Sequence, residues 1–137
     1  AWLYRAGGTG DWSRLNTSSA SIAGLRFGDF DGDGLTDVIR AVDGQWLVSW
    51  SGRGRWAELV SSAVELDSLL FGDFNGDGRI DMVRRTPRAT WEIIYGAARG
   101  DWDGWRRLRI DSRSLSAVRL GDFDGDGRTD LFRTDCY

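Results

Sequence analysis

Histidine and lysine do not occur in this chain, and cysteine, proline and methionine occur once each. Without histidine, the chain lacks the commonest general base and the commonest nitrogen ligand of metal ions. A serine–histidine–aspartate triad is therefore impossible. The single cysteine, Cys136, cannot form an intrachain disulfide, and a zinc site built from cysteines is excluded. We expect Cys136 to be a passive thiol, with an interchain disulfide as the alternative.

Long apolar runs are also missing. No stretch approaches the roughly 18 residues of a membrane span, so we expect none. No basic and then apolar leader opens the chain, which predicts a cytosolic protein or a mature or trimmed one.

The residues give no sign of an enzyme. Outside three acidic loops, the carboxylates form no recognisable pair of the kind that cleaves glycosides. The glycine-rich stretch GGTG at residues 7–10 lacks the lysine of a phosphate-binding loop and predicts a hairpin turn. We therefore expect a non-catalytic protein with no catalytic residues.

All 18 basic residues are arginines, which raises the question of nucleic-acid binding. They are scattered apart from two short groups, within residues 84–88 and 106–109. On alternating strands, neighbouring side chains point to opposite faces, so neither group forms a basic stripe. We expect no nucleic-acid partner.

An acidic string returns three times along the chain. GDFDGDGLTD at residues 28–37 is followed by GDFNGDGRID at 72–81 and GDFDGDGRTD at 121–130, so successive copies lie 44 and 49 residues apart. Other residues keep nearly the same spacing: Trp2, Trp46 and Trp91; Trp12, Trp56 and Trp105; Leu15, Leu59 and Leu108. The chain therefore consists of three repeats, residues 1–44, 45–88 and 89–137, with an insertion around 97–104 in the third.

Each repeat is strand-like. Residues 45–51, 68–74 and 81–86 and the segment around 56–60 predict four short strands, and no stretch has a sustained helical period. Asp43-Gly44 predicts a hairpin turn, and Pro87, at the matching position, is expected to break the ladder. Four strands in a repeat of this size indicate an all-β chain of β-propeller blades, one domain over residues 1–137. A twelve-strand sandwich and a β-prism are the alternatives.

Three blades are too few to surround an axis, since propellers have about four to eight. The chain opens with the strands that follow an acidic hairpin and ends just after such a hairpin. These two halves are complementary. We expect a head-to-tail homodimer that completes both split blades and closes a six-bladed ring, because closure protects strand edges. The alternative is a piece of a longer propeller.

The acidic strings have the composition of calcium loops. Counted from Asp29, oxygen side chains fall at positions 1, 3, 5 and 9, a glycine at position 6 allows a tight turn, and position 7 can offer a backbone carbonyl. The predicted side-chain ligands are Asp29, Asp31, Asp33, Asp37; Asp73, Asn75, Asp77, Asp81; Asp122, Asp124, Asp126, Asp130. We expect about three Ca²⁺ ions per chain in a structural role.

Three other interpretations of the loops are weaker. An EF-hand needs a glutamate at position 12 and flanking helices, whereas position 12 is Arg40, Arg84 or Arg133 and strand-forming residues precede it. Simple Asx turns would explain one loop, but not oxygen donors at every ligand position of three loops in register. Mg²⁺ suits a cage made mostly of protein ligands less well than Ca²⁺ does.

The strings RFGDFDGDGLTDV, LFGDFNGDGRIDM and RLGDFDGDGRTDL resemble FG-GAP repeats of the VCBS type. Such repeats occur in the integrin alpha-subunit propeller, in fungal and bacterial propeller lectins and beside secreted bacterial hydrolases. The resemblance covers the whole chain. It implies a β-propeller with Ca²⁺ in the hairpin between the first two strands of each blade, with backbone carbonyls from Leu35, Arg79 and Arg128 as further ligands. The chain departs from the family in copy number, because family propellers commonly have six or seven blades.

Eight tryptophans are the best lead to a partner. The two that recur in each repeat predict packing between blades, with a sugar-stacking surface as the alternative. Trp102, beside the RGD tripeptide at 99–101, is expected to be the most exposed, and that tripeptide is a weak adhesion signal. The candidate ligand-binding residues are Trp12, Trp56, Trp102 and Trp105.

Two functions follow. The first is an extracellular, secreted, lectin-like module that binds carbohydrate or an extracellular protein. The second is a structural or protein–protein interaction scaffold, either appended to a secreted hydrolase or a self-assembling propeller fragment. A lectin should present repeated exposed aromatic pockets, whereas a scaffold should bury its tryptophans.

Overall fold

Short antiparallel strands make up the regular structure of this protein. The structure is a computed structural model that describes residues 1–97, 102, 104–108 and 114–134. Within these ranges there is no α-helix. The strands are β1 Trp2–Arg5, β2 Trp12–Asn16, β3 Arg26–Gly28, β4 Asp37–Val42, β5 Gln45–Ser49, β6 Ala57–Ser61, β7 Leu69–Gly72, β8 Asp81–Arg85, β9 Trp91–Ile94, β10 Arg106–Leu108, β11 Arg119–Gly121 and β12 Asp130–Phe132. Single 3₁₀ turns are η1 Ala6–Gly8, η2 Ile22–Gly24, η3 Trp50–Gly52, η4 Leu66–Ser68 and η5 Leu115–Ala117.

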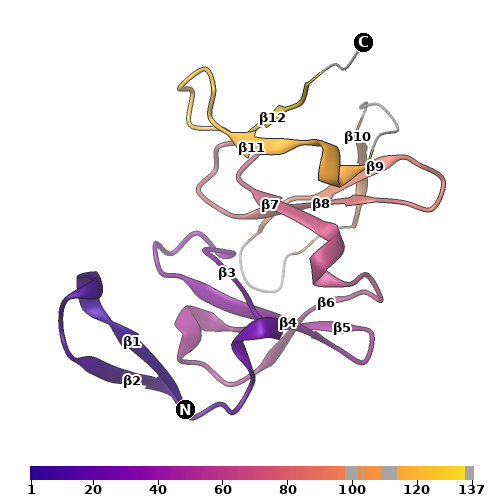
Figure 1. Cartoon of the computed structure of the whole chain (residues 1–137). Coiled ribbons are helices and arrows are strands. Elements are labelled where there is room, and N and C mark those ends of the chain that lie inside the picture. Colours follow the sequence, from indigo (N-terminus) through magenta and orange to yellow (C-terminus); the bar gives the residue numbers. More distant parts are fainter. Residues whose placement is uncertain (98–101, 103, 109–113, 135–137) are drawn as a thin grey trace. The chain divides into compact units, whose positions relative to one another are not determined.

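The strands form four separate antiparallel sheets. Two are complete four-stranded meanders, with the orders β3-β4-β5-β6 and β7-β8-β9-β10 (Figure 1). The other two are the pairs β1-β2 and β11-β12. The prediction of an all-β chain with four-stranded antiparallel sheets is confirmed, and the sheets are consistent with propeller blades.

Turn chemistry fixes the hairpin between β4 and β5. Asp43 and Gly44 both have positive φ, 50° and 75°, as a two-residue type I′ turn requires. The flanking residues Val42 and Gln45 pair directly across it. The predicted hairpin is therefore confirmed.

The expectation for Pro87 was wrong. β8 and β9 pair from Met82 to Arg85, so the ladder continues up to the turn that contains the proline. Thr86 donates its N–H to the carbonyl of Thr90 at 2.8 Å and closes a longer loop. Pro87 has no N–H to donate, but a turn position needs none, so the sheet tolerates it.

The chain divides into two compact units, residues 1–28 with 35–63, and residues 29–34 with 64–137. The prediction of one domain stays a prediction. The core of the first unit includes Ile39, Trp46 and Val48, each fully buried. In the first unit, GGTG connects β1 to β2 through η1, as the predicted hairpin turn requires.

The core of the second unit is built from equivalent residues. Val83, Trp91 and Ile93 are at most 1% exposed and pack with Val118. Trp46 and Trp91 occupy the same place in successive repeats, and both are buried in the core of their unit. Their predicted packing between blades stays a prediction. No helix in the described residues is long and apolar enough to cross a membrane.

Candidate metal sites

Each acidic loop wraps its backbone around the side chain of its first aspartate. Asp29 accepts N–H groups from Gly32 at 2.7 Å, Asp33 at 3.2 Å and Gly34 at 2.8 Å. Asp73 and Asp122 accept the three equivalent N–H groups at 2.8–3.1 Å. The same local sequence therefore builds the same loop three times.

Glycine is required at two points of this wrap. The fourth and sixth loop positions have positive φ in every copy, for example 80° at Gly32 and 84° at Gly34. Side chains other than glycine seldom adopt this conformation. The resulting tight curve turns the oxygens of alternate side chains toward a common centre.

Two loops bring three carboxylates together. Asp29, Asp31 and Asp33 form one triad, and Asp122, Asp124 and Asp130 form the other. In each triad the candidate ligand oxygens all lie within 4.8 Å of one another. Hard oxygens gathered this closely suit a divalent cation such as Ca²⁺, which takes six to eight of them.

The second loop differs because Asn75 replaces an aspartate. Its amide Nδ2 donates to Asp77 Oδ2 at 3.4 Å, and its Oδ1 accepts the N–H of Asp77. Asp73 keeps its three backbone donors. The loop thus has the shape of the other two with one carboxylate fewer, as the sequence predicted.

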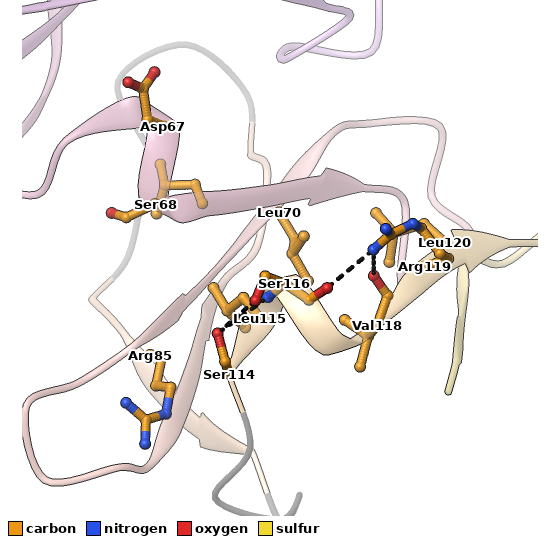
Figure 2. A pocket seen from close by; sticks show the side chains of 11 residues that line it. Asp67, Ser68, Leu70, Arg85, Ser114, Leu115, Ser116, Val118, Arg119 and Leu120 are labelled. Atoms are coloured by element: carbon orange, nitrogen blue, oxygen red, sulfur yellow. Dashed lines mark hydrogen bonds between the residues drawn. The ribbon is translucent and has the colours of Figure 1, made fainter. Parts of the chain in front are cut away.

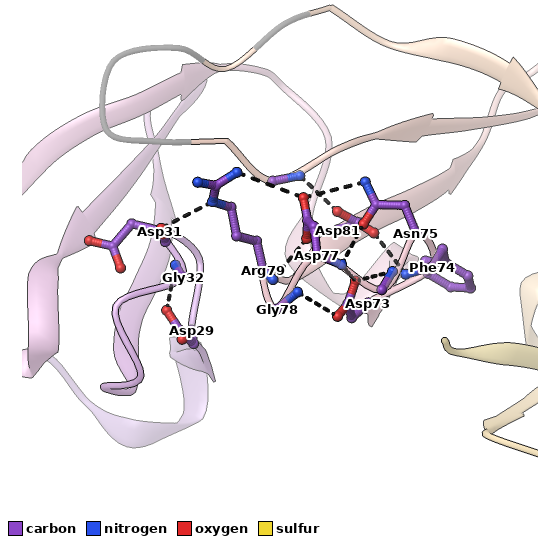
Figure 3. Close-up of polar contacts among 12 residues, drawn as sticks. Asp29, Asp31, Gly32, Asp73, Phe74, Asn75, Asp77, Gly78, Arg79 and Asp81 are labelled. Carbon is purple, nitrogen blue, oxygen red and sulfur yellow. Dashed lines mark hydrogen bonds and ion pairs between the residues drawn. The ribbon is translucent and has the colours of Figure 1, made fainter. Parts of the chain in front are cut away.

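In the first two loops, the last aspartate connects the loop to the segment that follows the next strand. Asp81 is fully buried, and its two oxygens accept N–H groups from Phe74 and Gly96, each at 2.8 Å. In the first unit, Asp37 is also fully buried and accepts the N–H of Ser51 at 2.7 Å. Figure 3 shows Asp81 among the acidic side chains of the second loop. The bonds from Gly96 and Ser51 come from just after β9 and β5, and the ligand pattern did not predict this role.

Burial has the largest effect on the pKa of Asp81. It raises the pKa of Asp81 from 3.8 to about 6, against the effect of the backbone donors Gly96 and Phe74, while the charges of Asp77 and Asp73 raise it further. A bound cation would oppose this shift because it favours the charged carboxylate.

The residues at the seventh loop position, Leu35, Arg79 and Arg128, were predicted to offer backbone carbonyls to the ion. This stays a prediction. The backbone N–H groups of Arg79 and Arg128 donate to Asp77 and Asp126, each at 2.9 Å.

Neighbouring loops are joined by hydrogen bonds that sequence reasoning missed. The eighth loop residue donates its N–H to the first aspartate of the preceding loop, from Ile80 to the carbonyl of Asp29 at 2.8 Å and from Thr129 to that of Asp73 at 2.7 Å. Figure 3 shows Arg79 extending from its own loop to the backbone of Asp31, with Nε 3.1 Å from the carbonyl.

The side chain of Arg79 also covers Gly32, where an added Cβ would lie 2.9 Å from it. Arg128 covers Gly76 in the same way, at 3.1 Å. The glycine at the fourth loop position was the only sequence signal for this close approach.

The candidate tryptophans differ in their surroundings. Trp12 is 64% exposed. Trp56 lies 4.3 Å from the guanidinium of Arg40, and Trp105 lies 4.1 Å from that of Arg84. The arginines at position 12 of the first two loops thus cover the tryptophans that directly precede β6 and β10.

The expectation that Trp102 is exposed was wrong. It is half-buried rather than the most exposed tryptophan, and its ring lies 6.4 Å from that of the fully buried Phe30. An apolar partner inside the same unit explains the difference. The RGD tripeptide and Cys136 lie outside the described residues.

Each unit has a pocket. In the first, a cavity of about 390 Å³ is lined by polar groups and one aromatic ring, including Asn16, Ser18, Arg40 and Trp56. In the second, a cavity of about 490 Å³ lies between η4 and η5, with Arg85 and Arg119 among its lining residues (Figure 2).

Two comparisons with known proteins were informative about the family. No curated protein sequence matches the chain significantly, whereas a family model does. The family model described as FG-GAP-like repeat matches residues 29–84 and 73–132, two overlapping matches that each span two acidic loops. Together they cover most of the chain, so this protein belongs to the FG-GAP repeat family.

Proposed function

We propose that this chain is a non-catalytic, Ca²⁺-binding β-propeller module in which each acidic loop holds one ion. The observation that carries the proposal is the threefold recurrence of one loop geometry, with carboxylate oxygens gathered within 4.8 Å in two of the loops. Ca²⁺ would supply positive charge to these carboxylates. The chain's own residues orient the oxygens, because backbone N–H groups fix the first aspartate of each loop.

Ca²⁺ titration tests this proposal. We expect isothermal titration calorimetry to give three ions per chain, and we expect the melting temperature to rise with Ca²⁺ and to fall again with chelator. Asp124→Ala should reduce the stoichiometry to two, because this side chain belongs to one triad. Asp11→Asn, at an exposed acid outside the loops, is the matched control. Absence of both binding heat and a thermal shift would refute the proposal.

We propose further that the sheets are blades of a six-bladed ring, closed when two chains of three blade equivalents join head to tail. The two complete four-stranded antiparallel sheets support the blades of this proposal.

For the biological role, the tryptophans favour an extracellular interaction module, which is one of the two functions left open by the sequence. Trp46 and Trp91 are buried, and arginines lie over Trp56 and Trp105. Such tryptophans stabilise the sheets and leave little repeated ring surface for sugars. A place outside the cell suits Ca²⁺ sites of modest affinity, as extracellular modules have.

Carbohydrate binding is the second candidate, supported by the cavity of about 390 Å³ in the first unit. Its lining includes Trp56 and Arg40, with the guanidinium of Arg40 lying over the Trp56 ring. A sugar hydroxyl can accept a hydrogen bond from a guanidinium N–H.

A glycan array, run with Ca²⁺ and again with chelator, tests the carbohydrate candidate. Calcium-dependent binding to one sugar class would support a lectin if the Ser18→Tyr substitution abolishes it. The tyrosine side chain of this variant would fill the cavity. Thr9→Tyr, at an exposed turn, is the control. No binding by chain shown to be folded with Ca²⁺ would leave the interaction module as the function.

A further inference from the structure

Successive acidic loops are bonded to each other within the second unit. This unit contains residues 29–34 and 64–137, so it includes the contacts of the first loop with the second and of the second with the third. At each contact, the residue at loop position 8 donates its N–H to the carbonyl of the first aspartate of the preceding loop. The second loop is therefore bonded to both of its neighbours.

The donor at position 8 lies between two predicted metal ligands. Ile80 stands between Arg79, whose carbonyl is a predicted ligand, and Asp81, the last carboxylate of the same loop. Its acceptor is Asp29, the first carboxylate of the preceding loop, which also holds the backbone N–H groups of that loop. Each such bond thus connects the ligands of one loop with the ligands of the next.

Arg79 adds side-chain contacts between the first and second loops (Figure 3). Its own loop orients it, because its N–H donates to Asp77 Oδ1 at 2.9 Å and its Nη1 lies 3.8 Å from Asp77 Oδ2. Its Nε donates to the carbonyl of Asp31 at 3.1 Å. Its Cγ lies over Gly32, 2.9 Å from the place of an added Cβ. The position of this side chain therefore depends on the conformation of both loops.

Thr129 connects the second and third loops in a different way. Its Oγ1 accepts the N–H of Asp73 at 2.9 Å, while its own N–H donates to the carbonyl of Asp73 at 2.7 Å. Ile80, at the same position of the second loop, has no side-chain acceptor, and there Arg79 supplies the second bond. Both junctions thus have one backbone bond and one bond that a side chain makes.

We infer that neighbouring loops bind Ca²⁺ with positive coupling, and that Arg79 and Thr129 are the positioning residues that transmit it. The inference rests on the proposed calcium module and adds how its sites act on one another. Ligands held in place in one loop also hold the residues at positions 7 and 8, which are bonded to the neighbouring loop. The neighbouring loop then loses less conformational freedom when its own ligands are ordered.

Charge acts in the opposite direction. Each bound Ca²⁺ adds two positive charges to its loop, which weakens the attraction of the next loop for a second cation. Loop positions 4 to 6 are exposed in all three copies, so water and salt screen this effect, with a Debye length of about 8 Å at ~0.15 M ionic strength. Hydrogen bonds act at contact distance and depend less on salt. We therefore expect positive coupling at this ionic strength, and we expect added NaCl to increase it.

Isothermal titration calorimetry measures the coupling between the first and second loops. Asp124→Ala removes the ion of the third loop, and Asp33→Asn or Asp77→Asn, added to it, leaves one working loop. The coupling factor is the product of both binding constants of the two-loop chain divided by the product of the two single-loop constants. We expect a factor of about ten. Arg79→Met should lower it to about three, because the backbone bond from Ile80 remains.

Thr129→Val is the matched variant at the other junction. It keeps the shape of the side chain but removes Oγ1, the acceptor of the Asp73 N–H. In the Asp33→Asn chain, where the second and third loops work, it should lower the coupling factor from about ten to about three. Arg79→Met should leave this second factor unchanged, because its side chain reaches the first loop.

The coupling factor distinguishes a positioning role from a merely structural one. A substitution that only weakens one loop lowers the single-loop and the two-loop constants alike, so its effect cancels. A factor of one or less at both junctions would refute the coupling and leave the calcium module intact. A factor that neither Arg79→Met nor Thr129→Val lowers would overturn the assignment of these residues. An unaltered chain that binds no Ca²⁺ would refute the module, and the coupling with it.

Discussion

Asp81 is the residue at which an acidic loop and a sheet are joined. Its carboxylate accepts one N–H from its own loop, at Phe74, and one from the end of the strand after the hairpin, at Gly96. It is fully buried, and its pKa is raised to about 6, chiefly by desolvation. The Asp81 side chain therefore holds the loop to the sheet through two hydrogen bonds, and a bound cation would lower its raised pKa.

Without Ca²⁺, we expect the Asp81 contribution to the free energy of unfolding to fall as the pH rises from about 4 to about 6. The folded chain, with a pKa of about 6, holds a proton in a range where the unfolded chain, with a pKa of 3.8, has released it. Stability from this group is thus greatest at low pH and is lost through the folded pKa. The loss is on the order of 2–3 kcal/mol and is measured by urea unfolding in chelator.

Asp81→Asn supplies the control, because it cannot titrate and should remove this part of the pH dependence. With saturating Ca²⁺ the dependence should weaken or reverse, since the cation favours the charged form. An unchanged pH profile in the Asp81→Asn chain would contradict the assignment.

Arg84 combines two contacts that predict its contribution to stability. Its guanidinium lies 4.1 Å from the ring of Trp105 and forms an ion pair with Glu92 at 2.6 Å. Arg84→Met keeps an apolar stem but removes the charge, so we expect a loss of about 1–2 kcal/mol in the free energy of unfolding. Arg14→Met, at an exposed position on β2, should change it by less than about 0.5 kcal/mol in the same denaturation experiment. Similar losses for the two variants would contradict this role.

At the scale of the element, local chemistry decided what the sequence could predict. The Asp43-Gly44 turn follows from residues next to each other in the chain and is as expected. Local sequence also brings three carboxylates together in two of the three loops, while the full set of predicted ligands stays a prediction. The expectation that Pro87 breaks the ladder was wrong because a proline, which cannot donate an N–H within a ladder, fits well in the turn between two paired strands. The packing of Trp102 on Phe30 and the bonds between loops join residues far apart in sequence, so local patterns did not reveal them.

Gly96 shows how closely the elements of the second unit approach each other. An added Cβ would lie 2.6 Å from the carbonyl oxygen of Ile80, a backbone atom that cannot rotate away. We expect Gly96→Ala to lower the free energy of unfolding by about 1–3 kcal/mol.

Gly24→Ala is the matched control for Gly96→Ala, because nothing lies within 4 Å of its added Cβ. It should be nearly neutral in the same urea titration. A neutral Gly96→Ala chain would show that the loop and the end of β9 can move apart at little cost.

For the whole molecule, the proposed ions change the sign of the charge. The formal net charge is −3 at pH 7, and three divalent cations add six positive charges, which gives +3. Native electrophoresis at pH 7 should therefore move the chain toward the anode in chelator and toward the cathode in Ca²⁺. Sodium chloride at matched ionic strength is the control. Migration toward the anode at saturating Ca²⁺ would mean that fewer ions bind.

The hydrogen bonds between successive loops have a consequence for inheritance. Each repeat carries a backbone donor at its eighth loop position and an acceptor at its first, as in the bonds from Ile80 to Asp29 and from Thr129 to Asp73. A gene that gains or loses one whole repeat thereby gains or loses one donor together with one acceptor. Recombination can change the number of copies while every junction keeps the same chemistry.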